Sequence, residues 1–227
     1  MPPTLEELPP AAQAAIDAVL GLIENDPTAP TTVSDRATAL RVHVADSLAG
    51  LDFEELRNAR MICDLGAGAG FPGLVLAAAL PDARVELLEA TGRKCEFMDR
   101  AIELAGLPNA SVVCDRAETW ALGEGGGRYD LVTARAVARL STLAELASPL
   151  LADHGCLLAW KGRRDEDEEA ELGRAAAGLA MESLEVRASG PYSGSENRHL
   201  HLLRKSGATP EGIPRRPGMA KKRPRGS

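Results

Sequence analysis

A short apolar stretch that ends in an acid runs directly into three alternate glycines. Residues 62–73 read ICDLGAGAGFPG, with Asp64 just before the first glycine. Glycine serves where a turn needs unusual dihedral angles and where a ligand approaches the backbone closely. The next expected strand ends in Glu89, and a carboxylate at this place can accept both hydrogen bonds from a ribose diol. Because a purely structural turn would not need the matching acid, the two features together predict a nucleoside-binding site.

Two kinds of nucleoside cofactor fit this pattern. Residues 68–73 match the G-x-G-x-x-G of dinucleotide-binding enzymes. Asp64 argues against a dinucleotide cofactor, because its carboxylate would repel a pyrophosphate. The same carboxylate could orient a cationic amino acid group of a ligand. The chain also leaves no second domain of dehydrogenase size. The D-x-G-x-G-x-G pattern is typical of Rossmann-type methyltransferases, whose sulfonium cofactor suits an acidic pocket. We therefore expect S-adenosyl-L-methionine as the cofactor.

The segment after the fourth expected strand helps to indicate which kind of atom accepts the methyl group. Methylation of an exocyclic base amine usually uses an (Asp/Asn)-Pro-Pro-(Tyr/Phe) loop there, whereas residues 133–136 read TARA. No cysteine follows a proline, so the nucleophile of pyrimidine-C5 methylation is missing. A ring nitrogen such as guanine N7 has an exposed lone pair and needs positioning but no catalytic base. The sequence therefore favours a ring-nitrogen acceptor.

Apolar runs alternate with amphipathic stretches through the middle of the chain. We expect helices from about Gly73 and from about Arg93, and strands over 61–65, 85–89, 110–114, 129–133, 156–160, 184–188 and 199–203. The alternation predicts a parallel sheet with crossover helices. The expected fold class is α/β, a Rossmann-like class I S-adenosylmethionine-dependent methyltransferase sheet with a helical N-terminal extension.

Helical patterns fill the first quarter of the chain. Apolar residues over 16–23 share one face, and Ser34 is expected to cap a second helix. We divide the chain into a helical N-terminal extension (1–58), a Rossmann-like methyltransferase domain (59–205) and a basic proline-rich tail (206–227).

The net charge of −7 is unevenly distributed. From Arg204 to Ser227 there are eight Lys or Arg residues and one Glu, so this segment carries +7 and the remainder −14. The asymmetry predicts an anionic partner that is met by one edge of an acidic protein. The prolines predict that the tail is extended or disordered in isolation. Because it lies outside the strands that build the pocket, its deletion after Pro214 is expected to leave cofactor affinity nearly unchanged.

Composition excludes several classes of protein. No apolar stretch is long enough to span a bilayer, and the N-terminus lacks the pattern of a signal peptide. The four cysteines are scattered without the paired spacing of a zinc site, which predicts buried thiols in a reducing compartment. With 3% aromatic residues, a stacking platform for bases is not expected. We expect a cytoplasmic protein without a metal or a membrane partner.

Several motifs together resemble a known family. They are residues 64–73, LEATGRK (88–94), RAE (116–118), ARAVARL (134–140), Lys161-Gly162, HVADSL (43–48) and the tail PRRPG (214–218) with Lys222 and Pro224. This set is similar to the bacterial 16S ribosomal RNA guanine-N7 methyltransferases, ribosomal RNA small subunit methyltransferase G, also called glucose-inhibited division protein B. The resemblance covers about residues 42–224.

The resemblance implies roles for individual residues. It places Asp64, Gly66, Gly68, Phe71, Glu89, Ala117, Glu118 and Arg135 at the S-adenosyl-L-methionine site, with Arg135 between cofactor and substrate. It implies RNA contacts for Lys161, Arg215, Arg216, Lys221 and Lys222. The implied partner is 16S ribosomal RNA or the small ribosomal subunit. Ala220 stands where a proline is frequent in the family, which predicts a looser tail.

Each of these residues also has a purely structural interpretation. Arg135 could pair within the sheet edge, and Lys161 could be an ordinary surface lysine. His43, Asp46 and Ser47 share a helix face and are expected to form a hydrogen-bonded interior cluster. The acidic segment 165–171 is expected to be a solvated helix face. Two other functions stay open: a small-molecule methyltransferase, and a ribosome assembly factor that keeps the pocket without catalysis.

Overall fold

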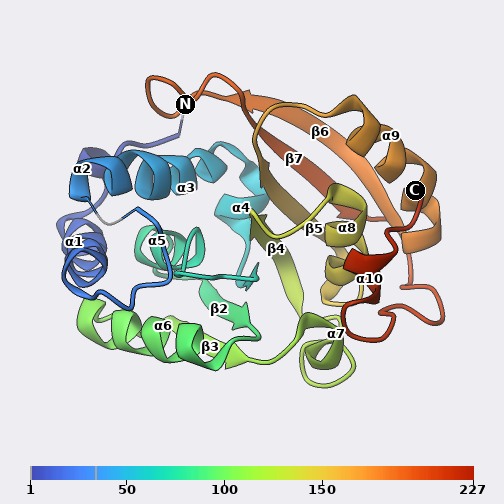
Figure 1. Cartoon of the computed structure of the whole chain (residues 1–227), viewed down its shortest axis with the longest axis horizontal. Helices are drawn as coiled ribbons and strands as arrows, with labels where there is room; N and C mark the ends of the chain where they lie inside the picture. Colours follow the sequence, from blue (N-terminus) through green and yellow to red (C-terminus); the bar gives the residue numbers. More distant parts are fainter. Residues whose placement is uncertain (1, 34) are drawn as a thin grey trace.

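A seven-stranded mixed sheet lies at the centre of the protein (Figure 1). The computed structural model describes residues 2–33 and 35–227. The strands follow the order β3-β2-β1-β4-β5-β7-β6. Neighbours from β3 to β5 are parallel, whereas β7 is antiparallel to both β5 and β6. The strands are β1 (Met61–Leu65), β2 (Arg84–Glu89), β3 (Ala110–Cys114), β4 (Tyr129–Arg135), β5 (Leu151–Lys161), β6 (Met181–Ser189) and β7 (Arg198–Lys205).

Helices cover both faces of this sheet (Figure 1). Short 3-10 turns lie at Leu5–Glu7, Ala49–Asp52 and Ala176–Leu179, and a π-helical turn, Leu40–Ala45, joins α2 to α3. The α-helices are α1 (Pro10–Asn25), α2 (Arg36–Ala39), α3 (Asp46–Leu48), α4 (Glu54–Asn58), α5 (Gly73–Ala79), α6 (Gly92–Ala105), α7 (Ala117–Trp120), α8 (Leu140–Ala147), α9 (Glu166–Ala175) and α10 (Met219–Lys222).

The expected strands all form, and the α/β class is confirmed. β1 and β3 have the expected bounds, while β5 to β7 extend further at their ends. The parallel sheet predicted for the alternating middle of the chain is confirmed for β1 to β4, whereas the last two strands are antiparallel. The connection over residues 190–197 is too short for a crossover, so β6 and β7 form a hairpin. β7 then inserts antiparallel beside β5.

The two faces of the sheet bury separate apolar cores. On one face, α1 packs against α5 and α6, and Ile16 and Leu20 share a core with Leu74. On the other face, α8 and α9 cover Val132 and Leu157. The N-terminal helices are therefore built into the packing of the sheet. The expected division of the chain falls at the ends of α4 and β7, and as a division into three parts it stays a prediction.

Two expectations about local structure need comment. Ser34 lies outside the described residues, and the residue that caps α2 is Asp35, whose side chain accepts from Thr38 N at 2.9 Å. The tail, which is expected to be extended or disordered in isolation, is packed on the domain in the full chain. Ile213 and Ala220 are buried against the second core and α8, because isolated apolar side chains in the tail find partners there. Among the described residues, no helix is long and apolar enough to cross a membrane.

Asp64 joins three elements at the end of β1. Its Oδ2 accepts from Gly73 N at the start of α5 at 2.8 Å, and its Oδ1 accepts from Thr133 Oγ1 on β4 at 2.9 Å. A Cβ at position 73 would lie 2.8 Å from Oδ2, so glycine is required there. Burial raises the pKa of Asp64 to about 6, although the two hydrogen bonds and Arg135 oppose the shift. The Asp64 side chain is buried, and its predicted part in orienting a cationic ligand stays a prediction.

The raised pKa makes Asp64 a source of pH-dependent stability. The folded state holds this proton up to about pH 6, while the unfolded chain releases it near 3.8, so its contribution to stability falls as pH rises through that window. In Asp64→Asn, the amide oxygen can accept from Gly73 N and the amide nitrogen can donate to Thr133 Oγ1. We expect Asp64→Asn to match the wild type at pH 4 and to exceed its free energy of unfolding by roughly 2–3 kcal/mol at pH 7.5.

Urea denaturation of both proteins at the two pH values checks this prediction. Glu96→Gln, on the exposed face of α6, is the matched control and should show no such difference. A variant that is less stable than the wild type by the same amount at both pH values would contradict the shift.

Candidate cofactor pocket and methyl-transfer site

A pocket of about 590 Å³ lies at the carboxyl ends of the parallel strands. This size suits a nucleoside-sized ligand, and the edge is where α/β sheets bind ligands. The ends of β1 and β2 form one side and residues 115–118 another. Residues 136–138 after β4 and residues of the tail close it. The predicted residues that line it are Gly66, Glu89, Ala117 and Glu118, and the tail contributes Gly218, Ala220, Lys221 and Lys222.

Glu89 holds the glycine loop to the end of β2. Its Oε2 accepts from Gly68 N at 3.2 Å, and its Oε1 accepts from Thr91 N at 2.9 Å. The ammonium of Lys94 lies 3.6 Å from Oε2. A carboxylate has about four lone-pair sites, so Glu89 keeps capacity for the hydroxyls of a ribose. Gly68 contributes through this hydrogen bond rather than as a lining residue of the pocket.

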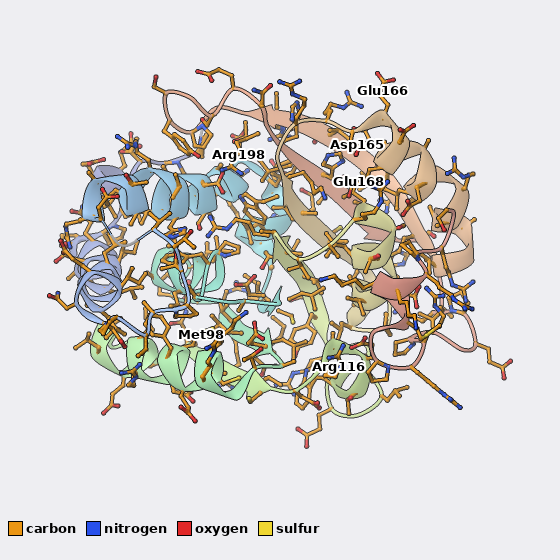
Figure 2. The ribbon with its side chains drawn as sticks, viewed as in Figure 1. Met98, Arg116, Asp165, Glu166, Glu168 and Arg198 are labelled. Atoms are coloured by element: carbon orange, nitrogen blue, oxygen red, sulfur yellow. The ribbon has the colours of Figure 1, made fainter. Side chains whose placement is uncertain are left out.

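Glu118 lies at the opposite end of the pocket, in the short helix α7. Its side chain is buried, and its Oε1 accepts from Gly218 N in the tail at 2.6 Å. Arg116, labelled near α7 in Figure 2, lies 3.4 Å from the same oxygen. An acceptor group in this place can read the polar edge of an adenine, and a segment a hundred residues away in the chain already contacts it.

Phe71 and Arg135 meet in a cluster beside the glycine loop rather than in the lining of the pocket. The rings of Phe71 and His43 stack at 4.5 Å with an interplanar angle of 11°. The Arg135 guanidinium carbon lies 5.6 Å from the centre of the Phe71 ring. Arg135 donates to Val42 O at 2.9 Å, and its Nη1 lies 3.1 Å from Asp46 Oδ2. The helical segment before β1 therefore fixes the arginine at the end of β4.

The protonation of His43 follows from these contacts. Arg135 Nη2 lies 3.2 Å from His43 Nδ1, and because a guanidinium only donates, Nδ1 must accept. The proton is then on Nε2, which lies 3.1 Å from Thr31 Oγ1. Burial and the charge of Arg135 lower the pKa of His43 to about 4, so the ring is neutral at pH 7. Ser47 Oγ donates to His43 O, and Asp46 and Ser47 are buried while His43 is half-buried. The purely structural role expected for this cluster stays a prediction.

Two of the predicted RNA-binding cations are engaged within the protein. Lys161 Nζ lies 2.6 Å from Glu168 Oε1 and donates to Ala138 O at 3.1 Å. Arg215 binds both oxygens of Glu145. Both side chains are thus held by carboxylates within the protein, so each has a structural role. Arg216, Lys221 and Lys222 are exposed, the last two at the mouth of the pocket.

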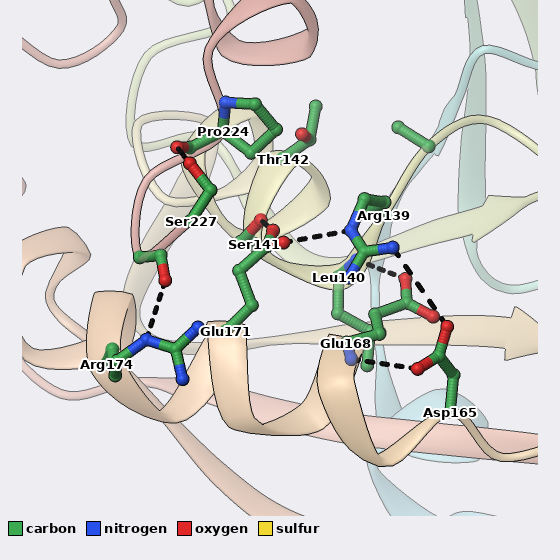
Figure 3. A network of polar contacts seen from close by, with 12 residues as sticks. Arg139, Leu140, Ser141, Thr142, Asp165, Glu168, Glu171, Arg174, Pro224 and Ser227 are labelled. Carbon is green, nitrogen blue, oxygen red and sulfur yellow. Dashed lines mark hydrogen bonds and ion pairs between the residues drawn. The ribbon is translucent and has the colours of Figure 1, made fainter.

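The expectation of a solvated acidic face over residues 165–171 is wrong at two of its six acids (Figure 3). Glu168 and Glu171 are buried. Glu168 accepts from Leu140 N at 2.7 Å, and Glu171 accepts from Arg139 Nε at 2.9 Å and from Ser141. These bonds hold the start of α8, directly after the pocket residues 136–138. Two carboxylates of α9 therefore position a wall of the pocket.

Sequence reasoning missed a further buried acid, Glu145 on α8. It stands alone in the apolar run LSTLAELASPL (140–150) and is 1% exposed. An isolated acid on an otherwise apolar helix needs a charged partner, and the arginines of the tail could supply one. That combination could have located the tail on α8.

The cysteines fit the expectation of buried thiols except at one position. Cys63, Cys95 and Cys156 are buried and Cys114 is exposed, and all four are free. Burial raises the pKa of Cys95 to about 12 and that of Cys156 to about 11. Over residues 2–33 and 35–227, no group of His, Cys, Asp and Glu is arranged to hold a metal ion.

Comparison with solved structures relates the fold to known methyltransferases. Fibrillarin from Aeropyrum pernix, solved with natively bound S-adenosyl-L-methionine, superposes with a TM-score of 0.53 over 70% of this chain and 72% of its own at 16% identity. A SAM-dependent methyltransferase from Aquifex aeolicus superposes with a TM-score of 0.57 over 79% of this chain and 98% of its own, also at 16% identity. At these identities the likeness concerns the fold, which is the Rossmann-like class I methyltransferase fold.

Sequence comparison is more specific. Ribosomal RNA small subunit methyltransferase G of Thermotoga neapolitana is 39% identical over 88% of this chain and 86% of its own. The protein of the same name from Chloroflexus aggregans is 42% identical over 89% of this chain and 85% of its own. The family model described as rRNA small subunit methyltransferase G matches residues 25–200. The chain thus belongs to the rRNA small subunit methyltransferase G family, a family of S-adenosylmethionine-dependent enzymes.

Proposed function

We propose that this chain transfers a methyl group from S-adenosyl-L-methionine to N7 of a guanine in 16S ribosomal RNA. Its partner is 16S ribosomal RNA or the small ribosomal subunit, and it acts in the cytoplasm. The observation that carries the proposal is the pocket at the carboxyl ends of β1 and β2, which has an acid at each end in a chain of this family. In this proposal Gly66 and Glu89 hold the ribose side of the cofactor, and Ala117 and Glu118 hold the adenine.

The methyl-transfer end is assigned to Phe71 and Arg135. Phe71 offers an apolar ring surface beside the glycine loop, and the guanidinium above it is held from three sides. The cofactor supplies an electrophilic methyl group on a sulfonium. Guanine N7 attacks with an in-plane lone pair, so the protein needs to orient the base and does not need to remove a proton. A fixed arginine with spare donors fits this positioning role. Asp64 acts indirectly, by holding the start of α5.

The target base has to be accessible before transfer can occur. N7 lies in the deep, narrow groove of an RNA helix, where side chains cannot read it. A guanine in a loop, or one that is turned out of its stack, meets the requirement. The exposed cations Arg216, Lys221 and Lys222 lie beside or at the mouth of the pocket and suit phosphates flanking such a base. Lys161 and Arg215 add positive charge to the same region, although carboxylates hold them.

A transfer assay tests the proposed function. The protein is incubated with tritiated S-adenosyl-L-methionine and either small subunits or naked 16S RNA from cells that lack the corresponding gene. We expect label in the RNA of at least one substrate. Label confined to small molecules of a cell extract would favour a small-molecule methyltransferase. Binding of subunits and cofactor without transfer would favour an assembly factor.

The first prediction of this proposal concerns Glu89. Glu89→Ala leaves the ribose hydroxyls and two loop amides without their acceptor, which costs roughly 1–3 kcal/mol. We expect the Kd for S-adenosyl-L-methionine to rise about 5- to 150-fold in calorimetry. Glu96→Ala, on the exposed face of the neighbouring helix α6, is the control and should bind like the wild type. Unchanged affinity in folded Glu89→Ala would remove Glu89 from the site, and tight NAD binding by the wild type would overturn the cofactor.

The second prediction concerns the exposed cations. Each cation that neutralises a phosphate releases condensed counterions, so its removal flattens the dependence of RNA affinity on salt. For the triple variant Arg216→Ala, Lys221→Ala, Lys222→Ala, we expect the slope of log K against log salt to fall by about 2 to 3. The titration is done with saturating S-adenosylhomocysteine so that the pocket is filled in every protein.

Arg84→Ala provides the comparison, because Arg84 is exposed at the amino end of β2, on the opposite edge of the sheet. It loses one charge but should keep the wild-type slope. If the triple variant also keeps that slope, the three cations do not contact RNA phosphates.

A further inference from the structure

The C-terminal segment follows α8 back toward the cofactor pocket after it leaves β7. Thr209 Oγ1 donates to Ser148 O at 3.0 Å near the end of α8, and Thr142 Oγ1 donates to Ala220 O at 3.1 Å near its start. Figure 1 shows α10, in red, beside α8. The segment is therefore held along one helix, and its last turn reaches the pocket.

One ion pair dominates this attachment. Arg215 Nε lies 2.6 Å from Glu145 Oε1, and Arg215 Nη2 lies 2.5 Å from Glu145 Oε2. The Glu145 side chain is 1% exposed and that of Arg215 is 22% exposed. A bidentate guanidinium–carboxylate pair with this little solvent fixes orientation as well as position. Arg225 Nε also lies 3.8 Å from Oε2, so two cations of the tail converge on one buried acid.

The residues that follow Arg215 form a wall of the pocket. Gly218 N donates to Glu118 Oε1 at 2.6 Å, and Ala220, Lys221 and Lys222 line the cavity. Gly218 has a φ of +82°, which lets the chain turn into α10 at this point. The helix α10 has only four residues and is too short to be stable alone. Its position therefore depends on the contacts made by the residues before and after it.

We propose that the Arg215–Glu145 ion pair is a positioning element of the cofactor site, which holds residues 218–222 across its adenine end. The inference rests on the proposed function, because it takes the pocket to be the site of S-adenosyl-L-methionine. It also reverses the expectation that the tail is irrelevant to the cofactor. A wall that is held in place before the ligand arrives reduces the ordering cost of binding and slows release. Without the pair, residues 218–222 are ordered only at the moment of binding.

The test compares Arg215→Gln with a matched surface pair. Arg204 donates from two nitrogens, at 2.8 and 2.7 Å, to one oxygen of Glu182 across β7 and β6. Arg204→Gln therefore removes one charge and one ion pair away from the pocket. For Arg215→Gln we expect the Kd for S-adenosylhomocysteine to rise about tenfold or more, with faster dissociation in stopped flow. At saturating RNA, the KM for S-adenosyl-L-methionine should rise for Arg215→Gln and stay at the wild-type value for Arg204→Gln. Arg215→Lys, which keeps the charge, should recover part of the affinity.

The outcomes separate this proposal from the proposed function. If the wild type and Arg204→Gln fail to bind S-adenosylhomocysteine, the cofactor assignment fails. If all of the proteins bind it equally, only the positioning role of Arg215 is overturned. A lower melting temperature of Arg215→Gln with unchanged affinity would show that the ion pair is purely structural.

Hydrogen–deuterium exchange of the wild-type chain keeps the proposal testable if Arg215→Gln does not fold. Without ligand, the amides over residues 216–223 should already exchange more slowly than those of the β6–β7 loop, and saturating S-adenosylhomocysteine should protect them further. Rapid exchange over 216–223 in the free protein would overturn the proposal.

Discussion

The buried carboxylate of Asp64 is the contact on which the cofactor pocket depends, because it joins β1, β4 and the start of α5 at one point. The glycine loop spans the gap between β1 and α5, and its shape follows from where those two elements are held. Gly66 at the start of the loop would clash with Val137 if it carried a Cβ, so the segment after β4 packs directly onto the loop. One desolvated acid thus links the loop that is proposed to bind the cofactor to the strand that carries Arg135.

The same use of acidic side chains recurs around the pocket. Glu89 holds Gly68 in the loop, and Glu118 holds Gly218 in the tail. Glu168 holds Leu140 after β4. In each case the acid accepts a backbone N–H of a segment that has no regular partner of its own, which satisfies a donor that would otherwise be buried unpaired. The strongly acidic body of the chain is therefore partly an internal feature, and the acids that remain at the surface leave contacts with an anionic RNA to a limited set of cations.

How far the sequence predicts the structure depends on whether a signal is local. β1, which is buried, and the half-buried edge strand β3 both read as short apolar runs, and the sequence predicts them with their bounds. The pairing of β7 between β5 and β6 was not predictable from such runs, because antiparallel insertion depends on which strand the hairpin meets in space. Asp64 and Glu89 were recognisable as important acids, but the sequence could not tell which of them faces the pocket. The tail was hardest: Ile213 and Ala220 stand among prolines and cations, and their burial depends on Glu145, some 70 residues earlier in the chain.

In the proposed function, the pocket and the Arg135 cluster deliver a methyl group to N7 of a guanine in small-subunit RNA. N7-methylation makes a guanine susceptible to borohydride reduction and to chain scission by aniline, which methylation at an exocyclic amine, at carbon or on ribose does not. RNA treated with the wild-type protein and S-adenosyl-L-methionine should be cut at one guanine in a loop of 16S RNA, and RNA treated with Arg135→Ala should not. Incorporation of tritium into the RNA without scission at any guanine would contradict the account.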